Sequence, residues 1–156
     1  MKLPPAMVKR CEELAGIAPK PRRKASTARV SSWGGWSITL TLNTSVVSCA
    51  NRRDHWTTAR RRAELQCEAL RKALAGSGLE NHVCPLPVVV TWVRIGRQML
   101  DDDNLASSFK ALRDALAKWL QCDDGDTSAA SWATTQRTGG EPGVEVTIRN
   151  RVEGNP

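Results

Sequence analysis

The sequence has little of what several common classes of protein require. Its only histidines are His55 and His82, which leaves little for a histidine-rich metal site or a Ser-His-Asp triad. Its five cysteines include no CxxC pair, which argues against a disulfide framework or a zinc ribbon, so we expect reduced thiols. No apolar run approaches the roughly 18 residues of a membrane span, and charges between Lys9 and Glu13 interrupt any secretory segment. We therefore expect a cytoplasmic protein with no membrane partner.

Two familiar motifs for phosphate and calcium are also missing. No GxxxxGK[ST] run occurs, which excludes a nucleotide phosphate loop of that kind. An EF-hand loop that began at Asp101 would need an oxygen ligand at its fifth position, where Leu105 stands. Calcium sensing by an EF-hand is therefore excluded as well.

What the sequence does have is an uneven distribution of charge. Lys and Arg number 23 against 16 Asp and Glu, and the net charge of +7 favours anionic partners such as nucleic acid. Residues 1–29 carry eight basic and two acidic side chains, whereas residues 98–126 carry seven aspartates and three basic residues. Either these aspartates are solvated loop and helix-start residues, or they hold a divalent cation against a polyanion.

The chain divides into three segments. Residues 1–32 are rich in proline and basic residues and predict a flexible arm, which either touches nucleic acid or only aids solubility. Residues 33–150 are of the length of one compact domain, and residues 151–156 form a short tail.

Hydrophobic periodicity predicts the order strand, helix, strand, helix, strand. We expect strands over residues 36–43, 87–95 and 143–148, and helices over residues 57–75 and 104–120. The fold class is then α+β, a single mixed β-sheet with two long helices packed on it. We expect Trp36 and Trp92 in the core and Trp33 at the surface, and we expect His55 to pack or to cap a helix.

Each predicted helix has an apolar face. The stripe of the first consists of Leu65, Ala69, Leu70, Ala73 and Leu74. That of the second consists of Leu105, Phe109, Leu112, Leu116, Trp119 and Leu120. On the opposite face of the second helix, four polar residues fall within roughly 40° of one another. They are Asp103, Ser107, Lys110 and Asp114.

Arginines gather around the start of the first helix. They are Arg52, Arg53, Arg60, Arg61 and Arg62. They form either a solvated face or a ridge that contacts phosphates.

The aspartates have a spacing suited to metal-dependent phosphodiester hydrolysis. Asp101 and Asp103 lie two residues apart at a strand-to-helix junction, where extended backbone would bring both side chains to one side. Asp123 or Asp124 supplies a third carboxylate only if the loop after the second helix folds back. Lys110 either touches a phosphate or pairs with Asp114 four residues later.

Three elements of the sequence together resemble the RusA family of Holliday junction resolvases, which is typical of phages and prophages. The family signature is a DxDN element, a helix that carries a lysine and Asp-Ala-Leu, and then a paired aspartate. The corresponding elements are Asp101-x-Asp103-Asn104, Lys110 to Leu116, and Asp123-Asp124. The resemblance covers residues 36–149 and leaves out the basic arm.

The resemblance implies a homodimeric, Mg²⁺-dependent endonuclease of DNA recombination and repair, with Mn²⁺ as a substitute metal. Such an enzyme nicks two strands of a four-way junction symmetrically, in the cytoplasm of a bacterial host. The residues implied are Asp101, Asp103 and Asp124 as metal ligands, Lys110 as the phosphate contact, and Asp102 and Asp123 as alternative ligands. Lys110 departs from the family pattern by one helical turn, about 4.5 Å at 1.5 Å per residue.

Two other functions fit the same residues. One is a protein of the same fold that binds branched DNA without cutting it, and whose aspartates are structural. The other is a nuclease that acts on other branched DNA by the same chemistry.

Overall fold

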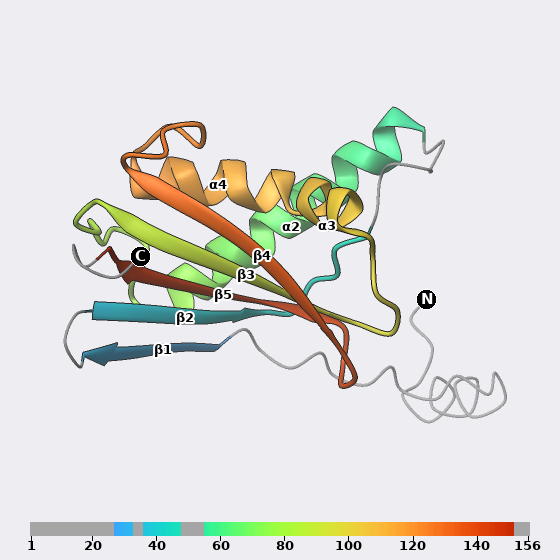
Figure 1. Ribbon diagram of the computed structural model, residues 1–156, viewed down its shortest axis with the longest axis horizontal. Helices are drawn as coiled ribbons and strands as arrows, with labels where there is room; N and C mark the ends of the chain where they lie inside the picture. Colours follow the sequence, from blue (N-terminus) through green and yellow to red (C-terminus); the bar gives the residue numbers. More distant parts are fainter. Residues whose placement is uncertain (1–26, 33–35, 48–54, 152–156) are drawn as a thin grey trace, which may run out of the picture.

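The computed structural model describes residues 27–32, 36–47 and 55–151, which form one mixed β-sheet with helices packed on it (Figure 1). The elements are β1 (Thr27–Ser32), β2 (Trp36–Leu42), α2 (Trp56–Gly76), β3 (Val88–Gly96), α3 (Asp102–Ser108), α4 (Lys110–Leu120), β4 (Ala130–Thr138) and β5 (Gly143–Asn150). The α+β fold with a single mixed sheet is thus confirmed. None of the helices in these ranges is long and apolar enough to cross a membrane.

The sheet has the strand order β1-β2-β5-β3-β4. Neighbouring strands are antiparallel except β3 and β4, which run parallel. In that parallel pair Val88 lies opposite Ala130, and Arg94 lies opposite Gln136. Because β3 and β4 are parallel, their C-terminal ends lie at the same end of the sheet. There the chain turns from β3 toward α3.

Two of the five strands were not predicted from the sequence. β1 lies within residues 1–32, the segment predicted to be an arm, and it pairs with β2. β4 occupies residues that carry few apolar side chains. Because β3 lies between β4 and β5, the turn at Gly139 and Gly140 does not close a hairpin of paired strands. Both glycines have positive φ angles, 97° and 78°, which are costly for other residues.

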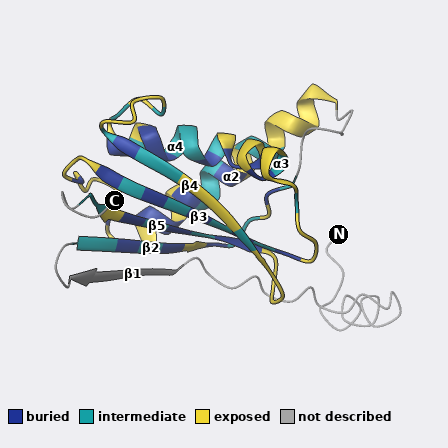
Figure 2. Ribbon diagram, viewed as in Figure 1, coloured by how far each residue is buried: buried dark blue, intermediate teal, exposed yellow. Residues whose placement is uncertain are grey.

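One face of the sheet is buried under the helices, as Figure 2 shows by the dark segments of the central strands. The alternation along each strand produces this burial, because every second residue points to the same face. The buried strand residues include Ile38, Leu40, Leu42, Val88, Val90, Trp92, Val144, Val146 and Ile148. The core positions of Trp92 and, at the margin, Trp36 are confirmed, whereas Trp33 lies outside the described residues.

The second predicted helix is broken in the structure. Residues 104–120 were expected to form one helix, but α3 ends at Ser108 and α4 begins at Lys110. The hydroxyls of Ser107 and Ser108 donate to the carbonyl oxygens of Asn104 and Leu105, and such bonds compete with the regular helical pattern. Phe109, at the break, is buried and stacks on Trp92 with ring centroids 5.6 Å apart.

The apolar face predicted for this helix pair is nonetheless correct. Its buried members are Leu105, Phe109, Leu112, Leu116 and Leu120. Trp119 is partly buried, and its indole N–H donates to the carbonyl oxygen of Leu79. The break at Phe109 therefore changes the local hydrogen bonding without turning the apolar face away from the sheet.

The first long helix differs from its prediction in one position of the apolar stripe. Leu65 is 56% exposed, whereas its neighbour Gln66 is buried and donates to the carbonyl oxygen of Ser45. The helix begins at Trp56, and the ring nitrogen Nδ1 of His55 accepts from the backbone N–H of Thr57. The predicted capping role of His55 is confirmed.

The cysteines within the described ranges are free thiols, as expected. They are Cys67, Cys84 and Cys122. Burial raises the pKa of the Cys84 thiol to about 11, so this thiol stays protonated at neutral pH.

We predict that replacing Leu70 with alanine costs about 2–5 kcal/mol of unfolding free energy, because its side chain is 2% exposed. The matched control on the same helix is Leu65→Ala, which is expected to stay within about 0.5 kcal/mol of wild type because Leu65 is exposed. Urea denaturation measures both values. Equal losses in the two variants would contradict the observed orientation of α2.

Candidate functional site

Three consecutive aspartates, Asp101 to Asp103, stand at the start of α3, and we call them the acidic turn. Asp101 is the N-cap residue, and its Oδ1 accepts from the backbone N–H of Asn104 at 2.9 Å. Asp102 and Asp103 occupy the first helical turn, where negative charge is favoured by the helix dipole. All three side chains are exposed.

The geometry of the acidic turn differs from the one expected. We expected extended backbone to bring Asp101 and Asp103 to one side, but the chain is already helical at Asp102. The Cα atoms of two residues spaced in this way are about 5–6 Å apart at a helix start. Side chains two positions apart on a helix do not face each other, so both aspartates must change rotamer to bring their carboxylates to one cation.

No lysine or arginine in the described ranges forms an ion pair with the acidic turn. The carboxylates of Asp102 and Asp103 accept no side-chain hydrogen bond there either. Within the described part of the chain, negative charge is therefore concentrated at this turn, where the N-terminus of α3 partly compensates it.

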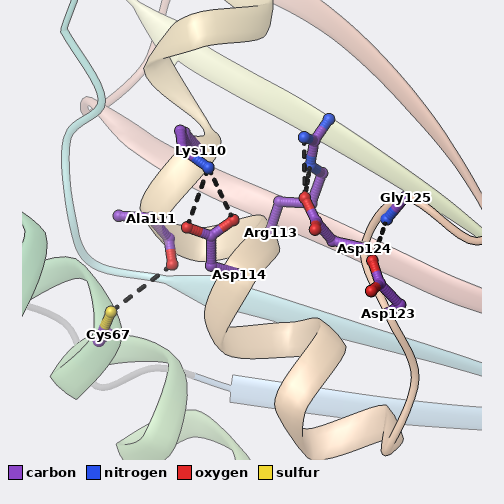
Figure 3. Close-up of polar contacts among 8 residues, drawn as sticks. All are labelled: Cys67, Lys110, Ala111, Arg113, Asp114, Asp123, Asp124 and Gly125. Atoms are coloured by element: carbon purple, nitrogen blue, oxygen red, sulfur yellow. Dashed lines mark hydrogen bonds and ion pairs between the residues drawn. The ribbon is translucent and has the colours of Figure 1, made fainter.

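Lys110 lies two turns further along and pairs with a different aspartate. Its Nζ is 3.3 Å from both carboxylate oxygens of Asp114 (Figure 3), and the side chains of Lys110 and Asp114 are 71% and 41% exposed. This is the i, i+4 pair that the sequence offered as the structural alternative for Lys110. Such exposed pairs contribute a few tenths of a kcal/mol, so the lysine can exchange partners at little cost.

The loop after α4 folds back, as the third carboxylate requires, but it folds onto α4 itself. Asp124 Oδ2 accepts from Arg113 Nη2 at 2.9 Å and from Arg113 Nε at 3.1 Å (Figure 3). Asp123 Oδ1 accepts from the backbone N–H of Gly125 at 2.8 Å. Neither aspartate is thereby brought to the acidic turn.

Other polar groups keep this loop ordered. The hydroxyl and backbone N–H of Ser128 donate to Asp126, which lowers the pKa of that carboxyl below its ordinary value. The pKa of the Cys122 thiol is raised by burial and by the neighbouring aspartates, Asp126 first among them. The contribution of the aspartates to the Cys122 shift reflects the negative charge that Asp123, Asp124 and Asp126 place in the loop after α4.

The residues fit Mg²⁺ in chemistry but do not enclose it. Within the described ranges, no three His, Cys, Asp or Glu side chains come together in a group that could hold a metal ion. Mg²⁺ is commonly bound by only one or two carboxylates, with water and substrate phosphate as the other ligands. Asp101 and Asp103 supply that smaller number, whereas Asp124 does not join them within one chain.

The predicted DNA-binding arginines lie on the first half of α2, apart from Arg52 and Arg53, which lie outside the described residues. Arg60 donates to Glu64 at 2.9 Å, and Arg61 is exposed. Trp56 precedes them with its side chain 66% exposed, an aromatic surface that was not expected from the sequence. The start of α2 and the start of α3 lie toward the same end of the long axis of the molecule (Figure 1).

Two further residues not anticipated from the sequence hold the chain just before the acidic turn. Arg94 donates to the carbonyl oxygen of Gln98, and Gln136 bonds the backbone of Leu100. One signal for Arg94 was present in the sequence. It occupies the same phase of β3 as Val88, Val90 and Trp92, so the alternation places a charged residue on the buried face.

We predict that Arg113→Gln loosens the loop after α4, because Asp124 then loses its partner. The loss of unfolding free energy should be only about 0.2–1 kcal/mol, since the pair is partly exposed. Hydrogen exchange of residues 121–126 should be faster than in wild type. Lys110→Gln removes a similar pair from the same helix and should leave that exchange unchanged. Unaltered exchange in Arg113→Gln would show that the pair does not hold the loop.

No protein-family model matches the chain, and no curated protein matches it. Among solved structures, the chain is similar to AaThiL complexed with AMPPCP and TMP, with 8% identity and a TM-score of 0.37 over 96% of this chain and 43% of that chain. It is also similar to the OmpA-like domain of FopA1 from Francisella tularensis subsp. tularensis SCHU S4, with 14% identity and a TM-score of 0.32 over 87% and 90%. The chain thus spans less than half of the AaThiL chain. Both likenesses are too weak to carry an argument about fold or function.

Proposed function

We propose that this protein is a RusA-type, Mg²⁺-dependent endonuclease that acts on four-way or other branched DNA. The observation that carries the proposal is the acidic turn, whose carboxylates are exposed and have no ion-pair partner in the described part of a basic chain. Three exposed carboxylates that have no cation beside them would repel phosphate, so they do not form a phosphate-binding surface on their own. They suit a divalent cation that is bound by carboxylates on one side and by a phosphate on the other.

In this proposal Asp101 and Asp103 hold the metal, and Asp102 is a substitute for either neighbour. When bound, Mg²⁺ would supply activation of water and neutralisation of charge at the phosphate. Lys110 exchanges Asp114 for a phosphate oxygen, which is inexpensive because their pair is exposed. Arg60 and Arg61 bind the flanking DNA backbone, and the exposed indole of Trp56 offers a surface on which a base can stack.

The proposal includes a homodimer for two reasons. A four-way junction has two related scissile phosphates, which a two-fold symmetric protein can meet with two equivalent sites. The second reason is that Asp124 pairs with Arg113 on α4, whereas Asp103 lies in the first turn of α3. If a third carboxylate takes part, a second copy is one source of it.

A second candidate function is branched-DNA binding without cleavage. The observation that favours it is that Lys110 and Asp124, two of the four residues implied in catalysis, are engaged in ion pairs. In that case these residues stabilise α4 and its following loop, and the acidic turn is a helix cap. A cleavage assay on a four-way junction separates the two functions.

We predict that wild-type protein nicks a labelled synthetic four-way junction at two symmetric positions with Mg²⁺ and not with EDTA. Asp103→Asn should abolish cleavage and keep or strengthen junction binding, because one negative charge near phosphate is removed. Linear duplex and flap DNA are assayed alongside. Lys118→Gln, which removes an exposed charge from the last turn of α4, is the control variant and should cleave normally.

Each outcome of this assay has a definite meaning. Cleavage by Asp103→Asn at the wild-type rate rules out the assigned metal ligand. A junction that wild type binds but leaves intact with both Mg²⁺ and Mn²⁺ supports the second candidate function. Cleavage of flap DNA in preference to the junction supports a nuclease on other branched DNA.

We also predict that the double variant Arg60→Ala, Arg61→Ala weakens junction binding and lowers its salt dependence. The slope of log K against log salt should fall by roughly 2, about 0.9 for each phosphate that the protein no longer neutralises. The variant Arg71→Ala, Lys72→Ala removes the same charge from the other half of α2 and is the matched control. Equal slopes in the two double variants would mean that the start of α2 has no special role.

A further inference from the structure

We infer, on the basis of the function proposed above, that Arg94 and Gln136 are positioning residues for the metal-binding aspartates. Together they attach the short connection between β3 and α3 to the sheet. That connection, residues 97–101, ends in the first aspartate of the acidic turn. Neither side chain needs to touch metal or DNA for this role.

Gln136 holds the residue directly before the acidic turn from both sides of its peptide backbone. The side-chain Nε2 donates to the carbonyl oxygen of Leu100 at 2.6 Å, and Oε1 accepts from the Leu100 N–H at 2.9 Å. The side-chain amide of Gln136 thus uses its nitrogen and its oxygen to bond the same residue, Leu100. Because two bonds fix a direction as well as a position, the backbone that enters Asp101 has little freedom to rotate.

Arg94 holds the same connection two residues earlier. Its guanidinium is buried, with Nη1 donating to the carbonyl oxygen of Gln98 at 2.6 Å and Nε donating to that of Val46 at 3.1 Å. No carboxylate in the described ranges forms an ion pair with it. A buried arginine that binds two carbonyl groups serves to hold backbone in place rather than to neutralise an acid.

The sheet places these two side chains side by side. Arg94 and Gln136 are register partners on the parallel strands β3 and β4, and both point to the face that the helices cover. A Cβ atom at Gly96 would lie 2.6–2.7 Å from the Arg94 guanidinium, so only glycine leaves room for it. Three positions on two strands therefore cooperate to hold one short connection.

The bonds lie where a metal site needs rigidity. Asp101 already uses Oδ1 to cap α3, and a cation that binds this carboxylate pulls on the cap. Leu100 and Leu105 anchor the two ends of the acidic turn, the first through Gln136 and the second by burial. With both ends fixed, the carboxylates are presented in one arrangement and less conformational freedom is lost on metal binding.

The test uses Gln136→Met, which keeps side-chain length and removes both hydrogen bonds. Hydrogen exchange at the amides of Leu100 and Asn104 should be faster in this variant than in wild type. Gln136→Glu keeps the acceptor and loses the donor, so its exchange should be intermediate. The matched control is Gln66→Met, which removes a glutamine-to-backbone bond from another connection, at Ser45. Equal exchange at Leu100 and Asn104 in Gln136→Met and Gln66→Met would overturn the inference.

A second readout concerns the metal alone. In Mn²⁺ titrations followed by the loss of the free-ion EPR signal, Gln136→Met should bind about tenfold more weakly than wild type and Gln66→Met equally well. Unchanged Mn²⁺ affinity in Gln136→Met overturns the role in metal binding. So does a wild type that binds no Mn²⁺. A wild type that binds Mn²⁺ through Asp103 but cleaves no DNA overturns the proposed function and leaves the positioning role standing.

Discussion

The contact between Trp92 and Phe109 joins the two halves of this structure. Trp92 lies on the interior strand β3 and is fully buried, and Phe109 lies at the joint between α3 and α4. Because α3 carries the acidic turn and α4 carries Lys110 and Asp114, this stack ties the joint between the two groups to the sheet. Buried aromatic side chains of this size contribute strongly to a core, so a smaller residue at either position would leave a cavity beneath the joint.

The charges around this joint fall into two kinds. Most carboxylates of α4 and its loop are paired or capped, as Asp114 is by Lys110 and Asp124 by Arg113. The three carboxylates of the acidic turn have no cation opposite them in the described ranges, although the chain as a whole is basic. A protein with basic residues to spare leaves these carboxylates unpaired, and unpaired charge is where a further ion is bound at the least cost.

The sequence predicted the parts of the fold whose physical signal is local. β3 was recognised from a run of β-branched residues, and the core face of residues 104–120 from its helical period. β1 and β4 were missed because they are the outer strands of the sheet, where β4 in particular needs few apolar side chains. The break at Phe109 depends on serine hydroxyls that bond back to the helix, a choice that periodicity does not register.

In the candidate site, too, the residues with a local signal were predicted and the contacts that depend on the fold were not. The aspartates of the acidic turn were found from their spacing, whereas the pairing of Asp124 with Arg113 and of Gln136 with Leu100 depends on how the chain folds back.

The space left by Gly96 has a consequence for the evolution of this chain. A larger residue at position 96 displaces a guanidinium that holds two carbonyl groups, so the loss falls on the hydrogen bonds of Arg94 to Gln98 and Val46. Conversely, a shorter side chain at position 94 removes the reason for the glycine. The effects of substitutions at positions 94 and 96 on stability are therefore expected to be coupled. A variant that enlarges residue 96 while Arg94 is retained should be less stable than one that changes both positions.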